Sequence, residues 1–501
     1  MAEKAAVQDC VRRSISRGRA SGPGLRWVFI RRARATGAQG GVSAAVNSAG
    51  AGGDRAGQRR DRAGSQRGVK RRFQVGAPAR AIPHASSRAA VLDVIRAAGT
   101  ISRVGLIDAT GFTGATISTV VRKLIEDGLV KETGRAESTG GKPRVLLQLD
   151  QSSRYAVGVH LDHSGIAYVL TDLGGSVVAR MTRAGAGTED PPAVVERMAA
   201  EVRTLIDGVG VDEARVLGIG LVSPGPLTPT TGMRLAPPIM RHWEDFPLDE
   251  AVERRTGLPV VLGNDATAAA LGEYWSGAVN GSSTFAAVYV CTGIGSGILI
   301  NGIPYHGTSG NAGEIGHICL DPDGPECWCG ARGCTEVMAG PAAVVARARA
   351  DAEAARSAGL DPDGPRGRSS VAAEFAAVAR AARRGEPAAR AIVDRSARYL
   401  AMATRTLANV LDLDRVVLSG QSLAVAGSLY LPIIQEELDR AFFARATHPV
   451  AVQISTSAAT APAIGAATTV LQSELVPLQP GTRIPEHLAE PEQARARPAE
   501  A

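Results

Sequence analysis

The chain has 501 residues, 45% of them hydrophobic and 4% aromatic, and carries a net charge of +7. At about 150 residues per domain, this length predicts roughly three units with enough apolar residues for folded cores. The positive charge is local, because residues 1–80 hold 18 Lys and Arg against 4 Asp and Glu, which leaves the remainder mildly acidic. Charge alone therefore does not establish nucleic-acid binding by the body of the protein.

The composition also restricts the compartment. Six Cys residues are too few for a disulfide scaffold and indicate a reducing environment. The longest uncharged stretch is interrupted by Gly, Asn, Ser and Pro, so it does not predict a membrane helix, and no signal peptide is recognisable. We expect a cytoplasmic protein without a membrane partner.

Both ends of the chain are predicted to be disordered tails. Residues 1–83 are a basic run rich in Gly, Ala and Arg, without periodicity, and cannot bury enough apolar surface to fold. A disordered arm or an over-extended start codon explains this run better than an Arg-rich transit peptide does. Residues 476–501, rich in Pro, Glu, Ala and Arg, predict a disordered C-terminal tail.

Residues 84–150 predict a compact unit of short helices followed by two strands. Apolar spacing predicts a first helix over residues 86–100, and Ser102 is expected to cap a second helix that ends at Gly111. Thr113 would cap a third helix, and a two-stranded wing with a Gly-Gly turn at 140–141 would follow. The third helix should turn five apolar residues inward: Ile117, Val120, Val121, Leu124 and Ile125.

The opposite face of the third helix is expected to contact DNA. Small hydroxyl residues near its start can approach base edges, and basic residues on the helix and the wing can contact phosphates. The predicted contacts are Thr113, Ala115, Thr116, Ser118, Thr119, Arg122, Lys123, Lys142 and Arg144. The alternative is a small protein-interaction module, since the unit has 9 basic and 7 acidic residues.

Residues 151–475 predict an α/β domain with buried sheets. Short β-like runs alternate with Ala-rich helical stretches. The predicted strands lie in residues 155–162, 166–173, 216–225, 258–265, 284–291, 296–303 and 415–421, and helices are expected over 341–411 around a loop at 359–369.

A cluster of thiols and one imidazole predicts a structural zinc site. His317 is followed by Cys327, Cys329 and Cys334, which together supply three thiolates and an imidazole for a tetrahedral ion. Because four protein ligands leave no position for water, the zinc would hold the surrounding loop rather than activate a nucleophile. The alternative is a set of free buried thiols.

These motifs resemble the ROK family, named for repressors, open reading frames and kinases. The helical segment with its closing turn at 140–143, and the strings E-x-G-H and C-x-C-G-x-x-G-C-x-E, carry a resemblance that covers roughly residues 86–475. It implies a winged helix-turn-helix followed by a two-lobed actin/hexokinase-like (ribonuclease H-like) domain with structural zinc. The sugar-binding residues of the family match Asn264, Asp265, Glu314, His317 and Glu336.

Sugar kinases of this fold use two Gly-rich turns to hold nucleotide phosphates. One turn is retained as Thr292, Gly293, Gly295 and Gly297. At the other, residues 162–166 lack one Gly and the Thr hydroxyl, and His163 is expected where phosphate would pass. The better match at 172–176 comes one strand later and is interpreted as an ordinary hairpin turn. These differences argue against an enzyme.

We therefore expect a sugar-responsive transcriptional repressor whose effector domain derives from a sugar kinase. Its partners would be operator DNA, a sugar or sugar derivative, and further copies of itself in a homodimer or a dimer of dimers. The alternative is an active ATP-dependent, glucokinase-like enzyme with an accessory DNA-binding domain, in which Asp265 would be the catalytic base. Ile239 and Met240 stand where family kinases place an Asn, which leaves the identity of the sugar open.

Overall fold

The computed structural model describes residues 87–135, 144–225, 227–228, 232–233, 238–277, 279, 282, 284–361 and 370–472. The predicted tails at 1–83 and 476–501 lie outside the described residues, as does Lys142.

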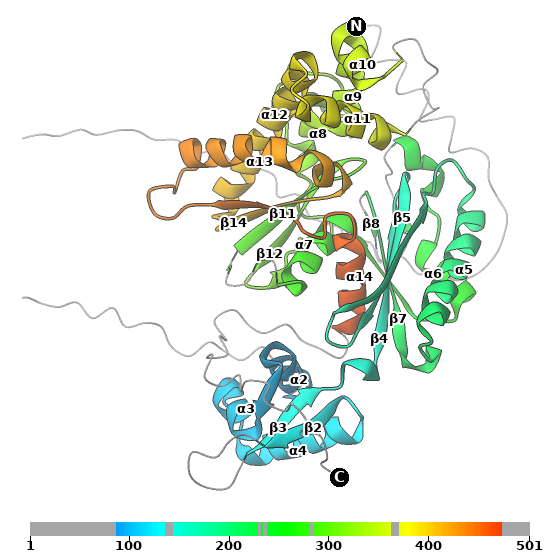
Figure 1. Cartoon of the computed structure of the whole chain (residues 1–501), viewed down its shortest axis with the longest axis vertical. Helices are drawn as coiled ribbons and strands as arrows, with labels where there is room; N and C mark the ends of the chain where they lie inside the picture. Colours follow the sequence, from blue (N-terminus) through cyan, green and yellow to red (C-terminus); the bar gives the residue numbers. More distant parts are fainter. Residues whose placement is uncertain are drawn as a thin grey trace, which may run out of the picture. The chain divides into compact units, whose positions relative to one another are not determined.

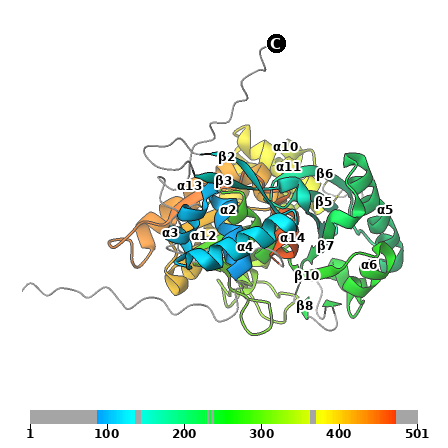
Figure 2. The same ribbon diagram turned by 90° about the horizontal axis from the view of Figure 1, so that it is seen from below.

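Residues 87–149 form three helices and a three-stranded antiparallel sheet, which Figure 2 shows together. The predicted caps are confirmed: the Ser102 hydroxyl accepts from the Gly105 amide, and the Thr113 hydroxyl accepts from the Thr116 amide. Gly111 ends the second helix at φ 71°. The elements are α2 (Ser87–Ala98), β1 (Thr100–Ser102), α3 (Arg103–Thr110), α4 (Gly114–Glu126), β2 (Val130–Arg135) and β3 (Val145–Leu149), with sheet order β1-β3-β2.

The next part of the chain forms a lobe around a five-stranded sheet of order β10-β7-β4-β5-β6. Its helices α5 and α6 pack on one face, where Trp243 and Tyr168 are buried in the core (Figure 1). The elements are η1 (Gln151–Ser153), β4 (Tyr155–Leu161), β5 (Gly165–Asp172), β6 (Val177–Ala184), α5 (Pro191–Val209), η2 (Glu213–Arg215), β7 (Val216–Ser223), β8 (Leu227–Thr228), β9 (Gly232–Met233), η3 (Pro238–Trp243), α6 (Leu248–Thr256) and β10 (Val260–Asn264).

A second lobe surrounds another five-stranded sheet, of order β13-β12-β11-β14-β15. Helices α12 and α13 cover one face and α7 lies against the other (Figure 1). The elements are α7 (Asp265–Trp275), β11 (Thr284–Val290), β12 (Ile294–Ile300), β13 (Ile303–Pro304), η4 (Ile315–His317), α8 (Thr335–Ala339), α9 (Pro341–Ala350), α10 (Ala352–Ala358), α11 (Val371–Arg383), α12 (Pro387–Leu411), β14 (Arg415–Ser419), α13 (Gln421–Ala441) and β15 (Ala451–Ile454).

Two helices join the lobes between their sheets. The last helix, α14 (Ala461–Leu471), packs against α7 and also against β4 and β7 of the first lobe (Figure 1). Small residues permit this approach: a Cβ added to Gly158 would lie 1.8 Å from the Ala463 carbonyl oxygen. The first lobe is therefore in backbone-to-backbone contact with α14, which in turn packs on α7.

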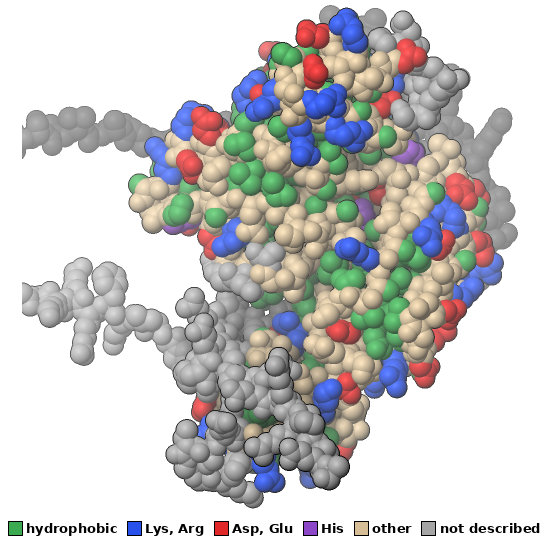
Figure 3. Space-filling model, in the orientation of Figure 1, with side chains coloured by type: hydrophobic (Ala, Val, Ile, Leu, Met, Phe, Trp, Pro, Cys, Tyr) green, Lys and Arg blue, Asp and Glu red, His purple; other side chains and the backbone are tan. Residues whose placement is uncertain are grey.

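Every predicted strand is present, but the prediction missed β1, β6, β15 and the two-residue strands. Strand β6 lies at the edge of its sheet, and six of its eight residues are exposed, so its sequence lacks a buried stripe. On the visible face, basic and acidic side chains are interspersed, in agreement with the near balance of charge after residue 80 (Figure 3).

No single described helix has both the length and the apolarity that a membrane span requires. The pair α3 and α4 meets them only when joined across a 119° bend.

Candidate functional site

A cavity of about 130 Å³ with several polar side chains in its wall lies where the ends of β4, β7 and β10 meet the β11–β12 turn. This volume is well below the roughly 300–1,000 Å³ typical of pockets for drug-sized ligands. All five predicted sugar-binding residues line the cavity, namely Asn264, Asp265, Glu314, His317 and Glu336. The cavity therefore gathers side chains from sequence positions 72 residues apart and suits a small polyhydroxylated molecule.

The start of α7 fixes two of these side chains. Asn264 is the N-cap of the helix, and its side-chain oxygen accepts from the Thr267 amide at 3.0 Å. The Asp265 carboxylate accepts from the Ala266 amide at 2.8 Å. These hydrogen bonds therefore orient both residues, which line the cavity.

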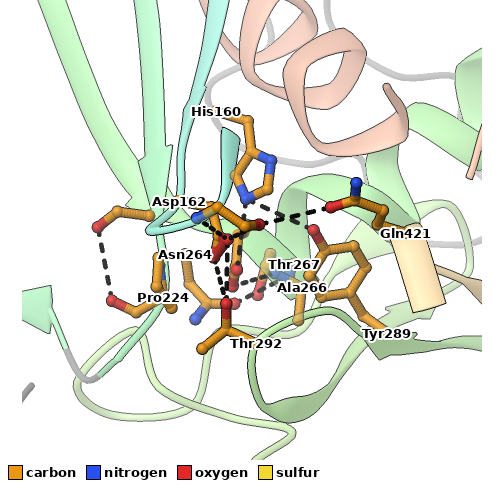
Figure 4. Close-up of polar contacts among 12 residues, drawn as sticks. His160, Asp162, Pro224, Asn264, Ala266, Thr267, Tyr289, Thr292 and Gln421 are labelled. Atoms are coloured by element: carbon orange, nitrogen blue, oxygen red, sulfur yellow. Dashed lines mark hydrogen bonds and ion pairs between the residues drawn. The ribbon is translucent and has the colours of Figure 1, made fainter. Parts of the chain in front are cut away.

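Asp265 also has a buried neighbour that the sequence did not reveal. His160 Nε2 lies 3.6 Å from Asp265 Oδ2 and 3.4 Å from the Tyr289 hydroxyl. All three side chains are buried, and they come from β4, α7 and β11. Figure 4 shows His160 and Tyr289 close together, and Asp265 and Tyr289 also line the cavity. This contact therefore links the two lobes beside the cavity.

Two further carboxylates face Asp265 across the cavity. Burial, followed by the charges of Asp265 and Glu336, raises the pKa of the Glu314 carboxyl to about 7. Glu336 accepts from the Trp328 indole at 2.7 Å and from the Ile294 amide at 3.1 Å. The three carboxylates can thus accept several hydroxyl hydrogen bonds, and Glu314 can also donate one when it is protonated.

Side chains of the two predicted phosphate turns form hydrogen bonds with one another. Thr292 donates to both oxygens of the Asp162 carboxylate, at 2.7 and 3.0 Å, and Figure 4 shows the two side chains pointing toward each other. The Ser164 amide and hydroxyl donate to the same carboxylate at 3.1 and 2.8 Å, and that hydroxyl lies 3.5 Å from Gln421 Oε1. Turns from both lobes therefore bond to one another here.

The entry of the His163 imidazole into the phosphate path stays a prediction. His163 does not line the sugar cavity, and its carbonyl accepts from the Gly187 amide in the turn after β6. The Asp162 side chain occupies the turn. The similar string at 172–176 is the β5–β6 hairpin turn, as predicted.

The four residues predicted for the second turn lie in two different elements. Thr292 and Gly293 lie in the three-residue turn between β11 and β12, where a Cβ on Gly293 would meet Glu336 Oε2 at 2.5 Å. Gly295 and Gly297 lie within β12, and a Cβ on Gly297 would lie 2.1 Å from the Ala266 carbonyl oxygen. Close packing of β12 under α7 therefore explains Gly297 without any phosphate.

The predicted metal ligands converge beside this cavity. The four ligand atoms of His317, Cys327, Cys329 and Cys334 lie within 4.8 Å of one another. His317 Nδ1 is 3.6 Å from Cys327 Sγ, and the sulfurs of Cys329 and Cys334 are 3.8 Å apart. Tetrahedral zinc, with bonds of about 2.3 Å to sulfur and 2.0 Å to nitrogen, requires separations of about 3.5–3.8 Å. The cluster could therefore hold a metal ion.

The loop that carries these thiols depends on one glycine. Gly333 has φ 58°, and a Cβ there would lie 1.7 Å from the Asp321 carbonyl oxygen. Only glycine fits this close approach. The loop ends at Cys334, the N-cap of α8, which places Glu336 in the first turn of that helix beside the cavity.

The predicted DNA-contacting face of α4 is solvent-accessible. Ile117, Val121 and Leu124 are buried as predicted. The outward residues Ala115, Ser118, Thr119, Arg122 and Lys123 are exposed, as is Arg144, and Thr116 is partly buried with its hydroxyl 2.9 Å from that of Thr113. A shallow pocket beside this helix is lined by Arg103, Ser118, Thr119 and Arg122 among others.

Sequence reasoning missed four residues that shape the site: His160, Asp162 as a hydrogen-bond acceptor, Trp328 and Gln421. Three of them act through partners more than 100 residues away, which no local pattern specifies. Trp328 could have been noticed, because it stands between two of the predicted ligands.

Comparison with known proteins identifies the family of this chain. Residues 156–473 match the ROK family, which is more than half of the chain. The chain belongs to the ROK family. The xylose repressor of Bacillus subtilis (strain 168) is 32% identical over 245 residues, which is 49% of this chain and 63% of that protein.

Two solved structures extend the comparison. A ROK family transcriptional regulator described as a homologue of the Escherichia coli MLC protein superposes with a TM-score of 0.62 at 25% identity, over 77% of this chain and 96% of that one. A ROK glucokinase from Streptomyces griseus, in complex with glucose and AMPPNP, gives 0.55 at 30% identity, over 64% and 99%. This ROK domain therefore has the mixed α/β, actin/hexokinase-like fold.

Proposed function

We propose that this ROK protein is a transcriptional repressor that responds to a sugar. Residues 84–150 bind operator DNA as a winged helix-turn-helix, and residues 151–475 bind the sugar. The observation that carries the proposal is the state of the cleft, where the sugar cavity is open but the turns that would hold a nucleotide bond to one another through Asp162 and Thr292. Such a regulator acts in the cytoplasm, with the chromosome.

The helical unit supports operator binding by its geometry rather than by its charge. Helix α4 follows α3 across a short turn and presents small polar residues near its start, where a recognition helix meets base edges. Arg122 and Lys123 on the helix, and Lys142 and Arg144 in the wing, would contact phosphates. Two copies of the chain would place two such helices on half-sites about one DNA turn apart.

The cavity supports sugar binding by the number and kind of its polar groups. Asn264 and Asp265 at the start of α7, with Glu314, His317 and Glu336 opposite, can pair with several neighbouring hydroxyls at once. A site built from buried polar groups rejects molecules that lack those hydroxyls, because the groups would be left unpaired. Zinc held by His317 and the three cysteines would fix the loop between two of these residues.

Helix α7 provides a route from the sugar to the DNA-binding unit. It begins with Asp265 at the cavity and ends with Trp275, whose ring centroid lies 4.2 Å from the Arg96 guanidinium carbon on α2. Arg96 in turn donates to the buried Asp93 carboxylate at 2.8 Å. We infer that a sugar at the start of this roughly 16 Å helix changes the position of α2, and through it operator affinity.

The kinase alternative has one observation in its favour. Asp265 lies beside His160 and could act as a general base for a sugar hydroxyl. A nucleotide, however, would have to separate Asp162 from Thr292 and deprive a buried carboxylate of one of its donors. We therefore place the activity in sensing rather than in phosphoryl transfer.

A combined binding and activity experiment tests the proposal. The purified chain is titrated into DNA from upstream of its own gene, with and without each sugar of a panel, and is assayed for sugar-dependent ATP turnover. We expect a sequence-specific complex that one sugar weakens, without turnover. Turnover at an ordinary enzymatic rate that Asp265→Asn abolishes would establish the kinase instead.

Matched variants separate the parts of the proposal. Arg122→Ala should weaken operator binding and lower its salt dependence by about one counterion, whereas Arg254→Ala, an exposed residue on α6, should change neither. Arg96→Ala should keep sugar binding but reduce the effect of sugar on operator affinity. An Arg96→Ala protein with unchanged coupling would exclude α7 as the route.

Metal analysis tests the zinc proposal separately. The purified protein should contain about one zinc per chain, and Cys329→Ser should lower both the zinc content and the melting temperature. A protein without zinc that binds sugar normally would contradict it.

A further inference from the structure

Trp328 lies between two predicted metal ligands and forms part of the wall of the sugar cavity. Its side chain is partly buried, its indole nitrogen donates to Glu336 Oε1 at 2.7 Å, and its ring meets the His317 ring edge-on with centroids 5.0 Å apart. Neither the motif nor the predicted sugar ligands include this residue. Its role must therefore be inferred from these contacts.

The contacts of Trp328 fix the orientation of a carboxylate. Glu336 Oε1 receives the indole N–H and Oε2 receives the Ile294 amide, so both oxygens are held from the protein side. A carboxylate has about four acceptor positions, which leaves the others for a ligand in the cavity.

Both oxygens of Glu336 have close neighbours in the protein. The Trp328 indole nitrogen lies 2.7 Å from Oε1, and a Cβ added to Gly293 would lie 2.5 Å from Oε2. The flat ring also offers an apolar surface to the C–H face of a pyranose.

The charges of the cavity exclude a phosphorylated ligand. Asp265, Glu314 and Glu336 line it, and among the described residues no Lys or Arg does so. The start of α7, which would otherwise attract an anion, has amides already occupied by the side chains of Asn264 and Asp265. A phosphate of charge about −1.5 to −2 would therefore meet carboxylates without a cation.

We propose that the effector is a neutral, unphosphorylated monosaccharide and that Trp328 determines specificity by orienting Glu336 and packing against the sugar ring. This inference rests on the sugar-binding function proposed above. It names the chemical class of the effector and adds a residue that touches it.

Calorimetric titration of the full chain with D-glucose, D-xylose, N-acetylglucosamine and glucose 6-phosphate tests the inference. We expect one neutral sugar to bind and glucose 6-phosphate to bind at least tenfold more weakly. Trp328→Phe keeps a ring but removes the N–H, and should weaken the neutral sugar about tenfold, the usual effect of a hydrogen bond to a charged group. Gly293→Ala adds a Cβ that would lie 2.5 Å from Glu336 Oε2, the oxygen that Trp328 does not contact. This substitution leaves the cysteine loop unchanged and should also weaken binding.

Tryptophan fluorescence gives a second readout that a purely structural role would not affect. The chain has four Trp residues. The sugar-induced change in emission should be lost in Trp328→Phe and retained in Trp243→Phe, a core residue of the first lobe. Zinc content and melting temperature are measured for each variant, and Gly293→Ala decides the matter if Trp328→Phe fails to fold.

The failures of the two proposals are distinguishable. If glucose 6-phosphate binds more tightly than the neutral sugars, or if Trp328→Phe and Gly293→Ala both bind like wild type, the inference is overturned while sugar-responsive repression stands. If none of the four probes binds and none affects the operator complex, the proposed function and the inference both fail.

Discussion

The contact between α7 and α14 makes Gly465 sensitive to any added side chain. A Cβ at Gly465 would lie 1.8 Å from the Ala268 carbonyl oxygen, and this neighbour is backbone rather than a flexible side chain. A normal contact needs about 3.5 Å. Gly465→Ala therefore forces the helices apart by roughly 1.5 Å at their closest point, and α14 cannot retreat freely because it also packs on β4 and β7.

The size of the effect follows from two opposing contributions. Overpacking of a filled core costs about 1–3 kcal/mol, and a clash with backbone belongs at the upper end of that range. Replacing Gly by Ala inside a helix recovers about 1 kcal/mol of propensity. We expect a net loss of about 2 kcal/mol in the free energy of unfolding, seen as a melting temperature lower by about 3–5 °C.

Gly208 provides the matched control. It lies in α5, and no atom comes within 4 Å of a Cβ built there. Gly208→Ala should therefore raise stability by about 0.5–1 kcal/mol. Calorimetric melting of wild type and both variants, without sugar, compares the same chemical change at two sites. If Gly465→Ala melts at or above the temperature of Gly208→Ala, the proposed tight crossing of α7 and α14 is wrong.

Three further predictions concern single buried or capping groups. Burial raises the pKa of Glu273, against opposing hydrogen bonds from Ser455 and Ser419, so stability should fall as the pH rises above the unfolded value of 4.5 and through the folded pKa. The gain in melting temperature on Glu273→Gln should accordingly be larger at pH 8 than at pH 5, and an equal gain at both would contradict this. Thr292→Val removes one of the two hydroxyls that donate to the buried Asp162 carboxylate and should cost about 1–3 kcal/mol, whereas Thr292→Ser should cost far less in the same denaturant titration. Thr113→Ala removes the N-cap of α4 and should cost about 1 kcal/mol and weaken operator binding, while Thr113→Ser should retain both; equal behaviour of the two variants would show that the cap is unimportant.

Local signals in the sequence located the helices of residues 87–149 accurately. Ser102, Gly111 and Thr113 act on amides and carbonyls within four residues of themselves, so their roles can be read from neighbouring positions. The buried strands were predictable for a similar reason, since apolar runs mark them. The edge strand β6 was missed because most of its side chains are exposed.

The residues of the candidate site also differ in whether the sequence alone predicts their contacts. Sequence spacing alone brought His317 and the three cysteines together, because Gly-rich chain connects them over 18 positions and the residue types indicate one chemistry. It also indicated Glu336, two positions beyond the last thiol. Thr292 lies 130 residues from its partner Asp162, and Gln421 lies 257 residues from its partner Ser164, and no repeat or periodicity connects such positions.

The sequence by itself determined the family, the metal cluster, the capped helices and the location of the excess positive charge. Only the tertiary structure showed which residues of the two turns meet. The first phosphate turn looked merely degraded in sequence, but in the folded chain its Asp162 carboxylate bonds to Thr292 of the other turn. The physical reason is that β4 and β11 belong to different sheets, and the packing of α14 and α7 between those sheets determines which of their ends meet.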